Sequence, residues 1–249
     1  MTHYKLAAFL LALLPALSAQ PNHFGLPACS GPEREFAVRA YFVLCHGSNY
    51  KVPLWVGYEL TPDRLQRVAA RPTHFRTDAQ LARPGAHDAD YRHSGYTRGH
   101  LAPAADFAWS DRAIRATFLL SNTVPQHGSA NFGRWAQLES AIRKIAAASD
   151  AVYIFTGPIF DSPHPERIGP GRVAVPSHTF KVVLALRGGS KTMHAAIVPN
   201  TASVIEPLDH FTTTVAEVER RTGLDFFAEL DDEVERLLEA SPKPFECRR

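Results

Sequence analysis

The sequence predicts an α+β fold in which a mainly antiparallel central sheet is flanked by helices. Strand-length apolar runs occur along much of the 249-residue chain, but they do not alternate regularly with helical segments. Residues 131–148 carry apolar side chains at helical spacing, and the C-terminal third changes to a helical pattern. The content of 45% hydrophobic and 21% charged residues is typical of a soluble globular protein.

The first 19 residues are expected to lie outside this fold. His3 and Lys5 precede an apolar run at residues 6–14, and Ser18 and Ala19 follow as small residues near a cleavage point. This pattern predicts a secretory signal peptide, and residues 20–249 then form a single secreted or periplasmic domain. An uncleaved anchor is the alternative, but the run is shorter than the ~20 apolar residues that span a bilayer. We therefore expect no membrane association after cleavage.

The first part of the mature chain predicts strands followed by a long surface segment. Residues 20–35 are rich in Pro and Gly and suggest an extended arm, and residues 71–94 are polar, as functional loops often are. Residues 36–45 and 52–60 are apolar and predict a β-hairpin whose turn is residues 46–49. Thr61-Pro62 predicts the start of a short helical turn.

The rest of the chain mixes helices and strands. Trp135, Leu138, Ile142 and Ile145 give residues 131–148 the clearest helical pattern. Further helices are predicted at residues 110–116, at residues 215–221 ending at Gly223, and at the acidic residues 226–240. Further strands are predicted at residues 118–121, 152–155, 172–175, 179–186 and 192–198, with a turn at residues 188–190.

Three cysteines, Cys29, Cys45 and Cys247, remain in the exported chain. An oxidising compartment permits one disulfide and leaves one thiol. We favour Cys29–Cys45, which ties the N-terminal arm to the first strand. No Cys-x-x-Cys pair is present, which argues against a structural zinc site.

The residues with the strongest chemical signal lie between Tyr96 and Glu139. The run Thr97-Arg98-Gly99-His100-Leu101-Ala102-Pro103 is followed by Asn131 and Glu139 in the predicted helix. A guanidinium can hold phosphate, an imidazole can deprotonate water, and an amide oxygen can bind a hard metal ion. Together these groups suit the hydrolysis of a phosphodiester.

This order of residues resembles the DNA/RNA non-specific endonucleases of the ββα-metal (His-Me) superfamily. That family carries Asp-Arg-Gly-His, followed about thirty residues later by a metal-binding Asn at the start of a helix. Similar blocks occur in the family's order at residues 52–56, 156–158, 175–181 and 198–200, so the resemblance covers residues 51–200. It implies the ββα-metal fold and a metal-dependent endonuclease that attacks DNA and RNA and leaves 5′-phosphates.

The resemblance also implies a role for each residue. His100 is the expected general base, since its unperturbed pKa lies near neutrality. Arg98 is the best phosphate clamp, followed by Arg143. Asn131 is the expected ligand of Mg²⁺, with Mn²⁺ as the alternative ion, because these ions prefer oxygen donors. Glu139, eight residues after Asn131, matches a catalytic Glu of the family.

Two structural alternatives remain open for the helix. Asn is a favoured N-cap, so Asn131 could cap the helix instead of binding metal. Asn131, Trp135, Glu139 and Arg143 recur at steps of four, which predicts one ridge facing one cleft. Glu139 and Arg143 could also form only a surface i,i+4 ion pair.

Other residues are expected to support the site. Arg76 lies in a family-like block, Arg71 is close enough to be the true equivalent, and Arg92 is a weaker candidate for phosphate binding. Asn122 and Gln126 are expected to hold the metal's water molecules. Thr97 stands where the family has Asp, a departure that places metal affinity and optimum pH in doubt.

The expected partners are DNA and RNA, and a homodimer is compatible with the sequence. The formal net charge of +2 is mild and suits an enzyme that must release a polyanion. The competing functions are a phosphodiesterase for small diesters, a non-catalytic nucleic-acid-binding module in which Thr97 marks a decayed site, and a toxin-like effector.

Overall fold

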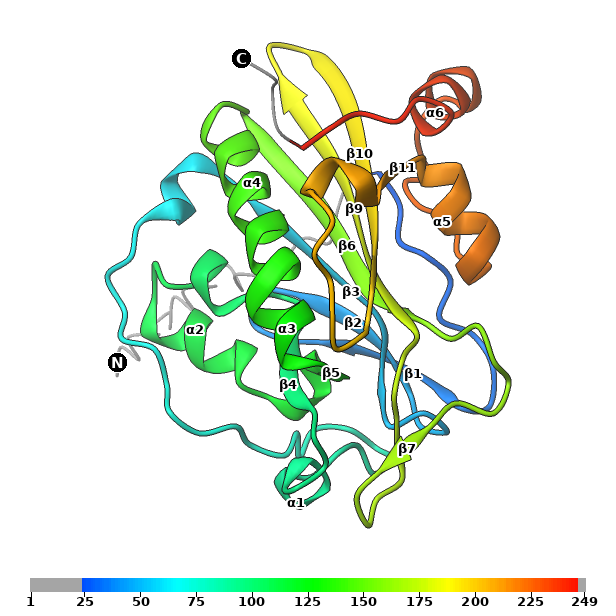
Figure 1. Cartoon of the computed structure of the whole chain (residues 1–249). Helices are drawn as coiled ribbons and strands as arrows, with labels where there is room; N and C mark the ends of the chain where they lie inside the picture. The colour runs from blue at the N-terminus through cyan, green and yellow to red at the C-terminus, as the bar shows by residue number, and fades with distance from the viewer. Residues whose placement is uncertain (1–23, 246–249) are drawn as a thin grey trace, which may run out of the picture.

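The centre of the molecule is a seven-stranded sheet, seen in a computed structural model that describes residues 24–245 (Figure 1). Its order is β1-β2-β3-β6-β9-β10-β11, and every neighbouring pair is antiparallel. The strands of this sheet are β1 (Arg34–Val38), β2 (Val43–Gly47), β3 (Val52–Leu60), β6 (Ala151–Ile159), β9 (His178–Arg187), β10 (Ser190–Pro199) and β11 (Thr212–Thr213). The predicted antiparallel α+β fold is confirmed.

Two small ribbons lie outside this sheet. One pairs β4 (Thr97–His100) with β5 (Thr123–Gln126), and the other pairs β7 (Arg167–Ile168) with β8 (Val173–Ala174). The helices are α1 (Asp88–Tyr91), α2 (Asp111–Thr117), α3 (Gly128–Ala130), α4 (Ala136–Ala147), α5 (Val215–Thr222) and α6 (Asp232–Glu239). A π-helical turn, Asn131–Trp135, joins α3 to α4, and short 3₁₀ turns span Pro62–Leu65, Ala104–Asp106, Leu120–Asn122 and Leu208–Phe211.

Each face of the central sheet is covered by its own apolar core. Side chains of a strand point alternately to the two faces. In β6, Val152 and Ile154 therefore join the core beneath α4, while Tyr153 and Phe155 join the core beneath α5 and the N-terminal arm. Figure 1 shows α4 crossing one face of the sheet, with the β4–β5 ribbon beside it, while α5 and α6 lie near the β10–β11 edge.

Three strand predictions need correction. The single strand predicted at residues 36–45 is two strands, because the chain turns between β1 and β2, where Arg39 N donates to Phe42 O over 2.8 Å. The residues predicted as the next turn partly continue β2, which ends at Gly47. Residues 118–121 are not a strand: the backbone turns at Leu120–Asn122, and the strand is the following Thr123–Gln126.

Two helix boundaries also differ from the predictions. The helix expected to start at residue 131 starts at Gly128, so Asn131 lies inside the helical segment, with φ −62° and ψ −49°. The helix expected at residues 226–240 starts at Asp232, whose preceding Asp231 caps the backbone amides of Glu233 and Val234. Phe226 and Phe227 are instead buried in the core beneath α5.

The disulfide prediction is confirmed, since Cys29 and Cys45 are bonded. This bond ties the N-terminal arm to β2, as expected. Cys247 and the predicted signal peptide lie outside the described residues. Among residues 24–245, no helix is long and apolar enough to cross a membrane.

Candidate active site

The β4–β5 ribbon places the central motif beside the helical segment. Arg98 and His100 are two residues apart in β4, so they share one face of the ribbon. Gly99 points to the other face, against Gln126 of β5. A Cβ atom at Gly99 would lie 1.9 Å from Gln126 Oε1, so any larger residue between the arginine and the histidine would displace the buried side chain of Gln126.

The imidazole of His100 lies between two aromatic rings. The ring centroids of Phe75 and Phe118 are each 4.9 Å from the centroid of His100. The guanidinium of Arg71 lies 5.1 Å from the centre of Phe118, and that of Arg98 lies 5.8 Å from the centre of Phe75. The two phenylalanines thus hold the imidazole and bring two cations to its neighbourhood.

His100 is only 8% exposed. Its Nε2 is buried and has no hydrogen-bond partner within the described chain, which leaves Nδ1 as the ring nitrogen toward solvent. Burial lowers the pKa of His100 to about 3, and the positive charge of Arg71 contributes in the same direction. The imidazole is therefore neutral at physiological pH and can accept a proton.

The backbone that follows His100 is held on both sides. Trp135 Nε1 donates to His100 O over 3.2 Å, and Lys181 Nζ donates to Leu101 O over 3.2 Å. Asn122 receives the Ala102 amide on Oδ1 and donates from Nδ2 to Ala102 O. These contacts fix the position of the imidazole.

The prediction that Asn122 holds metal-bound water needs correction. Its side chain is fully buried, and its Nδ2 donates to Thr117 O as well as to Ala102 O. Because its amide is used by the backbone, Asn122 fixes the loop after His100.

Asn131 and Thr97 form a pair across the ribbon and the helix. Asn131 Nδ2 donates to Thr97 Oγ1 over 2.9 Å, and Thr97 Oγ1 donates to Gln126 O over 2.8 Å. Because Asn131 lies inside the helical segment, the N-cap alternative is excluded. The amide orientation leaves Asn131 Oδ1 without a hydrogen bond to any described residue, and π-helical turns such as this one are frequent at functional sites.

The carboxylate of Glu139 lies in a cluster of charges. Asp106 is buried and accepts from Arg143 Nη1 over 2.9 Å and from Tyr58 Oη over 2.9 Å. Arg143 therefore pairs with Asp106, and the structure shows no ion pair between Arg143 and Glu139. Glu139 is half-buried and has neither a hydrogen bond nor an ion pair among the described residues. Burial raises the pKa of Glu139 to about 7, opposed by Lys181 and reinforced by Asp106.

The arginines differ in the contacts that they already make within the protein. Arg98 Nη2 lies 2.6 Å from Asp88 Oδ1, and its side chain is partly buried. Arg92 is exposed and pairs with the same aspartate over 3.4 Å. Arg76 donates to Arg115 O, whereas Arg71 affects the pKa of both His100 and Glu139. Of the upstream candidates, Arg71 is the one that the structure brings to His100.

The donor set here suits a hard cation. Asn131 Oδ1 and the carboxylate of Glu139 have no hydrogen-bond partners among residues 24–245. Both groups present oxygen atoms, which Mg²⁺ prefers, and Mg²⁺ needs few protein ligands because it keeps several waters. Gln126, which was expected to hold the metal's water, is instead buried against Gly99 on the opposite face of the ribbon, and its Nε2 donates to Thr179 Oγ1. The described residues contain no group of three or more His, Cys, Asp or Glu side chains that could hold a metal.

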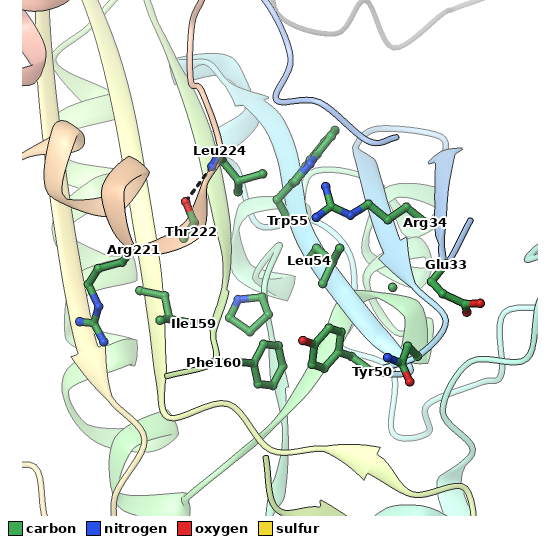
Figure 2. Close-up of a pocket in the computed structure, with 13 residues that line it drawn as sticks. Glu33, Arg34, Tyr50, Leu54, Trp55, Ile159, Phe160, Arg221, Thr222 and Leu224 are labelled. Carbon is green, nitrogen blue, oxygen red and sulfur yellow. Dashed lines mark hydrogen bonds between the residues drawn. The ribbon is translucent and has the colours of Figure 1, made fainter. Parts of the chain in front are cut away.

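A separate pocket of about 230 Å³ lies elsewhere on the molecule (Figure 2). Tyr50 and Phe160 stack at 4.4 Å on one side of it. Arg221 lines it but is bound to Asp161, and Glu33 lines it but is bound to Ser48 and Arg83. None of the residues predicted to act in hydrolysis lines this pocket, so it is distinct from the site at His100.

Sequence reasoning missed several residues that shape the site. Phe75 and Phe118 hold His100, Asp106 binds Arg143, and Lys181 lies beneath Trp135. A signal existed for Lys181, because a lysine ends the block at residues 175–181 in an otherwise apolar strand. No local signal identified the phenylalanines, since apolar residues before and after the motif resemble ordinary core residues.

Comparisons with known proteins point to one family of nucleases. A profile of DNA/RNA non-specific endonucleases matches residues 21–233. Mitochondrial endonuclease G of Bos taurus is 36% identical over 243 residues, which cover 87% of this chain and 81% of that protein. Nuclease C1 of Cunninghamella echinulata var. echinulata is 36% identical over 224 residues, covering 84% and 87% of the two chains. The crystal structure of the EndoG/EndoGI complex matches with a TM-score of 0.76 at 30% identity, covering 84% of this chain and 90% of that chain.

Proposed function

This chain belongs to the DNA/RNA non-specific endonuclease family, and we propose that it is an exported, metal-dependent endonuclease with His100 as its general base. The observation that carries this proposal is the buried imidazole of His100, held between Phe75 and Phe118 with two arginines beside the same rings. A neutral imidazole next to cations can activate water while the cations hold a phosphodiester.

The reaction begins with binding of the substrate phosphate by Arg71 and Arg98. His100 Nδ1 then accepts a proton from the water that attacks phosphorus. The P–O3′ bond breaks to leave a 5′-phosphate, and the departing 3′ oxygen takes up a proton from solvent to become a 3′-hydroxyl. Mg²⁺, or Mn²⁺ in its place, held by Asn131 Oδ1, would supply stabilisation of the charge on the phosphate and the departing oxygen. Glu139 presents an unpaired carboxylate that can accept a hydrogen bond from water beside Asn131.

The low pKa of His100 in the free protein fits this sequence of events. A base with a pKa of about 3 is weak, and proton transfer is most efficient when the pKa lies near the working pH. Part of the depression comes from the positive charge of Arg71. A bound phosphodiester carries one negative charge, which offsets the charge of Arg71, so the pKa of His100 rises when substrate is present.

Recognition through phosphate explains the absence of sequence preference. Guanidinium groups read the backbone that all nucleic acids share, and such contacts position a protein without specifying bases. They also release counterions, so cleavage is expected to slow steeply as salt increases. A small diester substrate would give a much flatter salt response.

Digestion of a plasmid and of ribosomal RNA, each with and without EDTA, tests the proposal. The purified mature chain should degrade both polymers with Mg²⁺ and neither with EDTA. His100→Ala should slow turnover by about 10²–10⁴-fold while DNA and Mg²⁺ binding survive, since the imidazole acts as the base. Asn131→Ala should weaken metal dependence, and high Mg²⁺ should partly restore its rate.

Each possible result distinguishes the proposed function from one competing function. Cleavage of DNA without RNA would remove the claim of sugar non-specificity. An inert parent that still binds nucleic acid would show a decayed module. Activity of His100→Ala equal to that of the parent would refute the general-base assignment, provided that both proteins have the same circular dichroism spectrum.

Export is proposed from residues 1–19 alone, because several relatives are named as mitochondrial proteins. A charged start followed by a short apolar run and small residues favours secretion. Fusing residues 1–23 to a periplasmic reporter, with Leu10→Arg as the matched control, tests this. A reporter that stays in the cytoplasm with the native segment would refute export.

A further inference from the structure

The two most exposed large apolar side chains among the described residues belong to segments beside the candidate active site. Phe132, the residue after Asn131, is 75% exposed, and Ile205 is 76% exposed. Their segments are joined, because Arg134 Nη2 donates to Ile205 O over 2.6 Å. A single exposed apolar residue is ordinary, but two on joined segments next to a reactive site indicate a binding surface.

The ring of Phe132 lies near the residue that precedes Arg98. A Cβ atom built at Gly128 would lie 3.7 Å from Phe132 Cε2 and 3.8 Å from Thr97 Cγ2, so only a small space separates the ring from Thr97. Thr97 Oγ1 in turn accepts from Asn131 Nδ2 over 2.9 Å. The ring therefore borders the pair of Thr97 and Asn131 at the proposed metal site.

The backbone that carries Phe132 is held by hydrogen bonds to the loop after β10. His127 N donates to Asn200 Oδ1 over 2.8 Å, and Ser129 Oγ donates to Thr201 O over 2.9 Å. Together with the bond at the other end of the turn, these contacts hold the chain before and after Phe132. A ring on a fixed backbone loses little conformational freedom when a ligand binds, which favours its use as a contact.

Two further rings and a cation lie on the same part of the β4–β5 ribbon. Tyr96, before β4, and His127, after β5, have ring centroids 4.7 Å apart, and both side chains are partly exposed. Arg98, the proposed phosphate clamp, follows Thr97 in β4. Proteins bind unpaired nucleotides with this combination of cations and aromatic rings, because every base has a π face that can stack on a ring.

We propose that Phe132 is a substrate-binding residue, on whose exposed ring an unpaired nucleobase stacks while the adjoining phosphate lies at Arg98 and Asn131. This inference rests on the proposed function, because the nucleobase belongs to the nucleic acid that is cleaved. A phenylalanine side chain has no hydrogen-bonding group, so its ring accepts every base of DNA and of RNA. Bases in a duplex are already stacked and paired, so the contact favours single-stranded over double-stranded substrate.

Binding to nucleic acids with and without bases tests this contact. The probes are a short single-stranded oligothymidine, a chain of the same length made of abasic nucleotides, and a duplex of that length, each measured by fluorescence anisotropy in EDTA. Phe132→Ala should weaken binding of the oligothymidine by about 5- to 150-fold, the loss expected for one base–aromatic stack. Binding of the abasic chain and of the duplex should stay unchanged, because neither offers an unpaired base to the ring.

Further variants define what the ring contributes. Phe132→Trp keeps an aromatic face and should bind the oligothymidine as tightly as the parent. Phe132→Leu keeps an apolar side chain without a π face, so it should lose affinity as Phe132→Ala does, and it decides the matter if Phe132→Ala does not fold. Phe36→Ala is the matched control, because it removes another exposed phenylalanine, which lies in β1 against Trp55, and it should leave all three affinities unchanged.

The kinetics of cleavage give a second measurement. A base that stacks equally well in the ground state and in the transition state contributes to binding alone. Phe132→Ala should therefore raise KM for single-stranded DNA and leave kcat unchanged.

The stacking role and the proposed function can fail separately. A parent that cleaves neither DNA nor RNA, but whose base-dependent binding is lost in Phe132→Ala, would refute the proposed function and support the stacking role. An unchanged affinity of folded Phe132→Ala for the oligothymidine would overturn the stacking role even if the parent degrades both polymers. An equal loss of affinity for the oligothymidine and for the abasic chain would overturn it as well, because the ring would then act without a base.

Discussion

Replacing Thr97 with Val tests how the metal ligand is oriented. The hydroxyl of Thr97 is the acceptor for Asn131 Nδ2 over 2.9 Å and the donor to Gln126 O over 2.8 Å. Valine keeps the branched shape but has no hydroxyl, so the amide of Asn131 loses the contact that directs its Nδ2 away from the site. Its Oδ1 is then presented to a cation for a smaller fraction of the time.

The structure sets the size of this effect. One neutral hydrogen bond contributes about 0.5–1.5 kcal/mol. Since about 1.4 kcal/mol corresponds to tenfold, the Kd for Mg²⁺ should rise by about 2- to 12-fold. Removal of a residue that orients a metal ligand commonly costs about 10–100-fold in affinity, so the upper end of this range is expected.

Isothermal titration with Mg²⁺ in the absence of nucleic acid measures this without relying on activity. Thr192→Val is the matched control, because Thr192 lies in β10, paired with Ala185 of β9, outside the β4–β5 ribbon. Thr97→Asp should instead tighten Mg²⁺ binding, since it can accept from Asn131 and adds a negative charge near the cation. If Thr97→Val binds Mg²⁺ like the parent while Asn131→Ala does not, Thr97 does not orient the ligand.

Three other predictions follow from the same contacts. Arg71→Ala should raise the pKa of His100 from about 3, because a positive charge that disfavours the imidazolium is removed; NMR titration of the His100 ring protons measures this, and an unchanged pKa would place Arg71 away from the base. Reducing Cys29–Cys45, whose positions are 16 residues apart, should lower the free energy of unfolding in urea by about 3 kcal/mol, and equal curves with and without reductant would contradict this. Burial and Glu219 raise the pKa of Glu239 to about 8, so its contribution to stability should fall as pH rises from 4.5, the pKa in the unfolded chain, through 8. Glu239→Gln should therefore have a higher Tm than the parent at pH 9 but not at pH 4, and the same pH dependence of Tm in both proteins would refute this.

The ion pair between Arg98 and Asp88 contributes to the affinity for substrate phosphate. Asp88 is half exposed and pairs with both Arg98 and Arg92. A phosphate that binds Arg98 therefore competes with a carboxylate that already occupies it. Substrate affinity includes the cost of breaking this surface pair, which is small in water, so the pairing does not argue against a role for Arg98 in binding.

The sequence alone predicted the class of the fold and pointed to the family. Apolar runs of strand length predicted the antiparallel sheet. Arg98, His100, Asn131 and Glu139, in an order that resembles the DNA/RNA non-specific endonucleases, indicated phosphodiester hydrolysis, and the family is confirmed by the profile match over residues 21–233. The Cys29–Cys45 bond was also predicted, because it ties the N-terminal arm to the first part of the sheet.

Only the tertiary structure decided how these groups are arranged. A propensity pattern could not show that the helix begins at Gly128, because the π-helical turn that follows depends on packing against β4 and β5. It could not show that Arg71, and not Arg76, approaches His100, since both lie in the same irregular loop and the choice depends on the ring of Phe118. Lys181 is 80 residues from Leu101 along the chain, and only the folded sheet brings its ammonium to the Leu101 carbonyl. Contacts between segments far apart in sequence leave no local signal, so the pairing of charges and the pKa values that follow from it belong to the folded molecule.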